Sequence, residues 1–161
     1  MSDQNTIFRS QAIDLLHELM SKPNHPYRMV TDHDGLSDTL RAVSAAAASA
    51  RLVPDDPTST IAAHVGHVAF AFATWNAWLE GNRAAVDWSA SWNHQIVDDR
   101  VWHDLRDRLD AGCVTIEATL QTVELDSPET IGGAMAMLAH LAYHIGAIQQ
   151  KIAALAARTA G

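Results

Sequence analysis

The stretch MAMLAHLAYHIGAI, residues 135–148, decides the fold class of this chain. It is almost entirely apolar, and it carries His140 and His144 four residues apart. Residues with this spacing lie on the same helix face, about 6 Å apart along the axis. Two imidazoles placed in this way can bind one metal ion, as the two histidines of the helical zinc-protease motif do. We therefore expect a long helix here and a third ligand from a neighbouring helix.

A second stretch supplies candidates for that third ligand. Residues 60–68, with the sequence TIAAHVGHV, place His64 and His67 on one side of a predicted helix. Three neutral imidazoles around an open position are the ligand set of a catalytic zinc site, and nickel and iron also accept imidazole. We predict a metal site of His67, His140 and His144. His64, one turn away, remains open as a fourth ligand, a hydrogen-bond partner of a ligand or a contact to substrate.

The alternative to a metal site is a set of core histidines that hydrogen-bond to the backbone or to other side chains. Two histidine pairs on two long helices favour the metal site over this alternative. His17 has Ser21 where the zinc-protease motif would need its second histidine. Four further histidines are predicted to be solvated in loops or on polar helix faces: His25, His33, His94 and His103.

Apolar residues recur at helical spacing in four long segments of the chain. The second is predicted to begin after Thr58 or Ser59, the third after Asp98 or Asp99, and the last after Ser127. An Ala-rich segment after Ser37 predicts one shorter helix, and no segment alternates like a strand. We therefore predict an all-α chain, a four-helix bundle with one additional short helix, as a single domain over residues 1–161.

The composition is that of one globular domain and argues against several functions. Of the 161 residues, 48% are apolar and 19% are charged. The net charge of −8 and the scattering of the 11 Lys and Arg argue against a nucleic-acid surface. Residues 1–5 lack the start of a signal peptide, and histidines interrupt the longest apolar stretch, so we expect a cytoplasmic protein outside the membrane. Cys113 has apolar neighbours and is expected to be a buried, unreactive thiol.

With these residues in place, the chain resembles the DinB/YfiT-like superfamily of metal-dependent helical-bundle proteins. The resemblance rests on residues 60–68 and 140–148, and on the tryptophans of the segment WSASW, residues 88–92, together with Trp102. It covers nearly the whole chain in helix order. It implies a four-helix bundle, commonly dimeric, in which one histidine of the second long helix and two of the last one bind a divalent metal.

The resemblance also implies a function. In some relatives the metal activates the thiolate of mycothiol, bacillithiol or glutathione. We therefore expect zinc, nickel or iron to activate a low-molecular-weight thiol, for transfer to a small-molecule substrate, or a water, for hydrolysis. The alternative is a non-catalytic dimeric bundle protein that binds metal or responds to stress. No catalytic acid or base can be assigned, and five side chains are expected to line the pocket: Trp75, Trp88, Trp92, Met137 and Tyr143.

Overall fold

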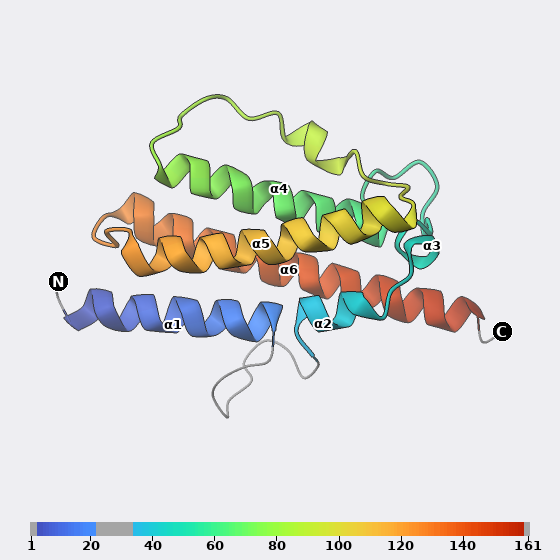
Figure 1. Cartoon of the computed structure of the whole chain (residues 1–161), viewed down its shortest axis with the longest axis horizontal. Helices are drawn as coiled ribbons and strands as arrows, with labels where there is room; N and C mark the ends of the chain where they lie inside the picture. The colour runs from blue at the N-terminus through green and yellow to red at the C-terminus, as the bar shows by residue number, and fades with distance from the viewer. Residues whose placement is uncertain (1–2, 22–33, 160–161) are drawn as a thin grey trace.

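The computed structural model describes residues 3–21 and 34–159, and every regular element within these ranges is helical. The predicted all-α class is therefore confirmed. Four helices are long and lie side by side, and the short ones lie in the connections (Figure 1). In chain order the elements are α1 (Asp3–Met20), α2 (Leu36–Arg41), α3 (Ala45–Ala48), α4 (Ile61–Leu79), the 3₁₀ helix η1 (Trp88–Trp92), α5 (Asp99–Thr122) and α6 (Pro128–Thr159).

Polar side chains begin the three helices that position the site. Thr60, Asp98 and Ser127 each accept a hydrogen bond from the backbone N–H three residues further on, at 3.1, 2.7 and 3.2 Å. Such bonds satisfy backbone donors that have no partner in the first helical turn. The predicted starts at Asp98 and Ser127 are confirmed. The cap of α4 is Thr60, so the prediction of Thr58 or Ser59 was wrong by one or two residues.

The single Ala-rich helix predicted after Ser37 is two short helices. α2 begins after Gly35 without a side-chain cap, and α3 begins after Ser44, whose hydroxyl oxygen caps it. Between them the indole of Trp102 donates from Nε1 to the backbone carbonyl of Val43 at 2.7 Å. This long-range bond satisfies a backbone carbonyl at the break between the two helices. The local pattern of alanines cannot reveal such a break, because the bonding partner lies far along the chain.

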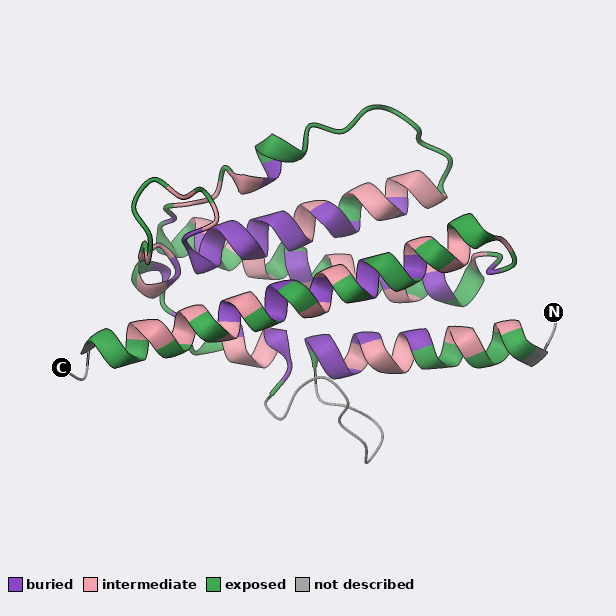
Figure 2. Ribbon diagram, turned by 180° about the vertical axis from the view of Figure 1, so that it is seen from behind, coloured by how far each residue is buried: buried purple, intermediate pink, exposed green. Residues whose placement is uncertain are grey.

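α4 is covered by more of the chain than any other element within the described ranges. α5, α6 and η1 all pack against it, so residues 61–68 are buried on every side (Figure 2). α4 and α5 run in the same direction, whereas α1 and α6 run in the opposite direction (Figure 1). The connection from α4 to α5 must therefore return along α4, and η1 lies within this returning segment.

The core lies between the four long helices. Its buried apolar residues include Leu16, Leu19, Val65, Phe72, Leu105, Leu109, Ile116, Leu120, Leu141, Ile145 and Ile148. Gly112 does not interrupt α5; a Cβ there would lie 3.0 Å from Cδ2 of Phe72, so the glycine lets α4 and α5 approach closely. Cys113 is half-buried, and burial raises the pKa of its thiol to about 12, in agreement with the predicted unreactive thiol.

α6 is the one helix in the described ranges that is long and apolar enough to cross a membrane. This criterion uses length and composition alone, and the core helix of a globular domain also meets it. In the structure α6 packs against α4 and α1, and 39% of its most apolar window is buried within the protein. Part of the apolar surface of α6 is therefore buried in the core.

The start of α2 touches the end of α1. A Cβ on Gly35 would lie 2.4 Å from the backbone nitrogen of Ser21 and 2.5 Å from the carbonyl carbon of Met20. Backbone atoms cannot move aside as a flexible side chain can. We expect Gly35→Ala to lower the free energy of unfolding by more than about 2 kcal/mol in urea denaturation.

Gly132→Ala is the matched control, because a Cβ on Gly132 in α6 would meet nothing within 4 Å. It should raise the free energy of unfolding by about 0.5–1 kcal/mol through helix propensity. Equal stability of the Gly35→Ala variant and the parent protein would contradict the close approach of α1 and α2.

Candidate metal centre

Three histidines from two helices direct their Nε2 atoms at one another. Nε2 of His140 lies 3.0 Å from Nε2 of His67 and 2.9 Å from Nε2 of His144. One ligand atom from each of the three residues lies within 4.8 Å of the other two. His140 and His144 share a face of α6 because they are four residues apart, and α4 crosses this face with His67. The structure thus brings together the three histidines predicted as ligands.

The hydrogen bonds of His64 determine the tautomer of His144. Nε2 of His64 lies 3.0 Å from the carbonyl oxygen of Thr58, and a carbonyl only accepts, so this nitrogen carries the hydrogen. Nδ1 of the neutral His64 ring is then an acceptor, and it lies 2.8 Å from Nδ1 of His144. Nδ1 of His144 must therefore donate, which leaves a lone pair on its Nε2. His64 is thus a hydrogen-bond partner of His144, not a member of the cluster.

Ser91 determines the tautomer of His67 in the same way. Its hydroxyl donates to the carbonyl of Trp88 at 2.6 Å, so its oxygen accepts from Nδ1 of His67, also at 2.6 Å. The remaining lone pair of His67 is then on Nε2. The ring of Trp92 stacks on His67, with centroids 4.0 Å apart and an interplanar angle of 14°. η1 therefore fixes both the tautomer and the orientation of this imidazole.

Without a cation, the three converging nitrogens have one proton to share. Nε2 of His67 and Nε2 of His144 both carry lone pairs, and both face Nε2 of His140. A hydrogen on Nε2 of His140 can make a good hydrogen bond to only one of them. One metal ion would bind all three lone pairs. In a tetrahedral site with bonds of about 2.0–2.1 Å the nitrogens are about 3.4 Å apart. The two short separations from His140 would therefore widen by about 0.4–0.5 Å, and the three ligand atoms already lie within 4.8 Å of one another.

Burial keeps these imidazoles neutral. Loss of water contact, followed by the charges of neighbouring histidines, lowers the pKa of His67 to about 4 and that of His144 to about 3. Burial likewise lowers the pKa of His140. The pKa of His64 falls to about 4, first through burial and then through the charge of Lys151. Neutral imidazole is the form that binds a metal.

The predicted pocket residues divide into two groups. Tyr143 contacts the ring of His144 edge-on at a centroid distance of 5.0 Å, and Trp88 and Trp92 contact His67. By contrast, Met137 is buried in the core, and the indole of Trp75 is half-buried beside Gly133. The structure therefore brings Trp88, Trp92 and Tyr143 to the histidines, while Trp75 and Met137 serve packing elsewhere on α4 and α6.

Among the described residues, no other histidine belongs to the cluster. His25 and His33 lie outside the described residues. His103 is exposed and contacts Asp107 at 3.0 Å. His94 is only partly solvated, because its ring is half-buried against α4: a Cβ on Gly66 would lie 3.0 Å from its Cδ2. The approach of the connecting segment to α4 buries this ring, and no local sequence signal reports it.

Sequence reasoning assigned no role to Ser91 or to the carbonyl of Thr58. Ser91 stands between Ala90 and Trp92 in the quoted segment WSASW, and its local sequence does not distinguish it from Ser89, which is exposed. The carbonyl of Thr58 gives no sequence signal, since every residue has one. Comparison with protein-family models, with curated proteins and with solved structures finds no match to this chain.

The lowered pKa values predict how the stability of the metal-free protein depends on pH. His64, His67 and His144 have pKa values of about 3–4 when folded, against 6.5 for the model side chain. Between about pH 4 and 6.5 the unfolded chain therefore binds more protons, and the free energy of unfolding falls as the pH falls. Each histidine contributes at most about 1.4 kcal/mol per pH unit. Urea denaturation with EDTA measures this slope.

His144→Leu should reduce the slope, because it removes a histidine that the fold keeps neutral. His103→Gln is the control, since it removes a histidine that is exposed on α5 rather than buried in the cluster. Carboxylates also titrate in this range, so the difference between variant and parent is the quantity to compare. An identical slope in His144→Leu and the parent would contradict the lowered pKa of His144.

Proposed function

We propose that His67, His140 and His144 bind one divalent transition-metal ion through Nε2, and that the protein is a metal-dependent enzyme. The observation that carries the proposal is the convergence of three neutral imidazoles, two of which have their Nε2 lone pairs directed inward by Ser91 and His64. Zinc, nickel and ferrous iron all accept such a ligand set. Three protein ligands leave at least one coordination position for a molecule from solution.

The open position would make a nucleophile. A divalent cation lowers the pKa of a bound thiol or water, so that the thiolate or hydroxide forms near neutral pH. His140 is half-exposed, and Trp88 and Tyr143 beside the cluster are 46% and 69% exposed, which is consistent with approach from solvent. We propose transfer of a low-molecular-weight thiol to an electrophilic small molecule, with hydrolysis as the alternative reaction.

We also propose that the chain belongs to the family that its sequence resembles. α1, α4, α5 and α6 would form a four-helix bundle of the DinB/YfiT-like kind, acting as a cytoplasmic homodimer. Support comes from the four long helices that lie side by side and from the distribution of the cluster, with one histidine on the second long helix and two on the last. The net charge of −8 supports a small-molecule substrate over a nucleic-acid partner.

A non-catalytic metal-binding protein is the second candidate. One observation favours it: the cluster consists of imidazoles only, without a carboxylate to act as acid or base. Both candidate functions require a bound metal ion, but only the enzyme would convert a substrate.

Metal content tests the site itself. Untagged protein should carry close to one equivalent of metal per chain by elemental mass spectrometry. His144→Ala should lose it, because two imidazoles and no replacement ligand bind far more weakly. His103→Ala, an exposed histidine replaced in the same way, should keep it. Metal-free parent protein after anaerobic incubation with zinc, nickel and ferrous iron would contradict the site.

Turnover then separates the two candidates. Low-molecular-weight thiols are paired with electrophilic substrates, and loss of free thiol is followed with the parent and with His144→Ala. Metal-dependent consumption in the parent alone supports the enzyme. Bound metal without consumption of any thiol, and without hydrolysis of ester or amide substrates, supports the non-catalytic protein.

The bonds that fix the tautomers should contribute to metal affinity. Ser91→Ala leaves Nδ1–H of His67 without its acceptor, and His64→Phe does the same for His144, so each ring can adopt the tautomer that places hydrogen on Nε2. We expect each variant to bind metal about 10–100-fold more weakly in competition with a chromophoric chelator. Ser89→Ala is the control, because within the described residues the hydroxyl of Ser89 bonds to Asp87 and not to a histidine. A similar loss in Ser89→Ala would assign the effect to η1 as a whole.

A further inference from the structure

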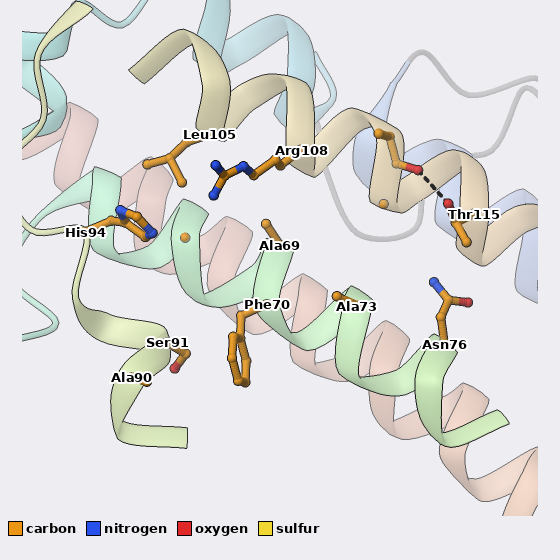
Figure 3. A pocket seen from close by; sticks show the side chains of 13 residues that line it. Ala69, Phe70, Ala73, Asn76, Ala90, Ser91, His94, Leu105, Arg108 and Thr115 are labelled. Carbon is orange, nitrogen blue, oxygen red and sulfur yellow. Dashed lines mark hydrogen bonds between the residues drawn. The ribbon is translucent and has the colours of Figure 1, made fainter. Parts of the chain in front are cut away.

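A second pocket lies on the other side of α4 from the histidine cluster. It has a volume of about 490 Å³, within the range of small-molecule sites, and lies between α4, α5 and the segment that contains η1 (Figure 3). Successive residues are about 100° apart around a helix, so Ala69 and Ala73 in this pocket face about 120–180° away from His64 and His67. This pocket is therefore separate from the candidate metal centre.

One end of the pocket is cationic. Arg108 of α5 and His94 of the connecting segment both line it, and their side chains lie on the same side in Figure 3. Neither has a hydrogen bond or ion pair within the described part of the chain. Other α5 side chains are paired, since Arg100 contacts Asp104 at 3.1 Å. In a chain of net charge −8, a guanidinium at a pocket mouth without an acidic partner is available to an anion.

The other end offers a hydrogen-bond donor on a buried residue. Asn76 is only 7% exposed, and its Oδ1 accepts from the hydroxyl of Thr119 at 2.8 Å. The amide NH₂ of Asn76 has no partner among the described residues. Thr115 lies across the pocket and donates its hydroxyl to the carbonyl of Ala111 at 3.0 Å, so its oxygen can only accept a further bond (Figure 3). The free donor at this end is therefore the amide of Asn76.

The space between the two ends is lined mainly by apolar side chains. Ala69, Phe70 and Ala73 of α4 form one wall, and Leu105 and Ala111 of α5 contribute to the other (Figure 3). From residue 69 to residue 76 the helix rises about 10 Å, which sets the length of the pocket. A flat apolar body fits between walls of alanine, whereas a highly charged molecule would lose its hydration there.

We propose that this pocket binds a small carboxylate with a flat apolar body and a hydrogen-bond acceptor at its far end. The carboxylate pairs with Arg108 and accepts from His94, the body packs between α4 and α5, and the acceptor receives the amide of Asn76. The site does not depend on a metal, so it stands or falls separately from the proposed function.

The probe for this site is 4-acetylbenzoate, titrated into ¹⁵N-labelled protein with EDTA present. EDTA prevents the carboxylate from binding to a metal ion. We expect saturable shifts at residues 69–76 and 105–115, and binding about 10–100-fold weaker for 4-acetylbenzamide, which lacks the charge. 4-Isopropylbenzoate, which lacks the acceptor, should bind several-fold more weakly. These comparisons use the parent protein and need no variant to fold.

Variants then assign the residues. Arg108→Gln should weaken the binding of 4-acetylbenzoate about 10–100-fold. Arg100→Gln removes the same charge from the same helix and should leave this affinity unchanged. Ala111→Leu should abolish binding by filling the pocket at an exposed helix position. His144→Ala should bind like the parent.

Three outcomes would overturn the proposal. The first is equal affinity of Arg108→Gln and the parent, and the second is no saturable binding at 10 mM probe (roughly the weak limit of specific binding). The third is loss of binding in His144→Ala, which would place the carboxylate at the histidine cluster.

Discussion

The hydrogen bonds that hold a proton on Nδ1 of His67 and of His144 are the constraint on which the site depends. Each chain of bonds ends at a backbone carbonyl, that of Trp88 or that of Thr58, and a carbonyl cannot donate. The direction of every bond in both chains is therefore fixed by backbone position. The backbone before α4 and the backbone of η1 thus determine which nitrogen of each imidazole faces the cluster.

The helices and the three converging histidines were predictable because their signals are local. Apolar periodicity marks α4 and α6, and a spacing of four places His140 beside His144 whatever surrounds them. His64 was already among the predicted alternatives as a hydrogen-bond partner of a ligand. Ser91 was not predictable, because it reaches His67 only through the path of a returning connection. The burial of His94 was missed for the same reason. The break between α2 and α3 likewise depends on the indole of Trp102, which lies 59 residues beyond Val43.

α4 separates two chemically different sites. Its histidines face α6, and its small residues Gly66, Ala69 and Ala73 face α5 and the connecting segment. The two sites share one residue: Ser91 lines the carboxylate pocket and also accepts from His67. A movement of η1 would therefore change both the lining of the pocket and the hydrogen bond to His67. Whether the two sites act together depends on how rigidly Trp92 holds η1 against the imidazole of His67.

The spread of the cluster along the chain has a consequence for biosynthesis. His67 and His140 are 73 residues apart, whereas His67 and its acceptor Ser91 are only 24 apart. A ribosome makes the chain from the N-terminus, so α4 and η1 emerge well before α6. The nascent chain can order the imidazole of His67 early, but it holds a single ligand until α6 docks. If the three histidines bind an ion together as proposed, they would do so only after translation has passed His144.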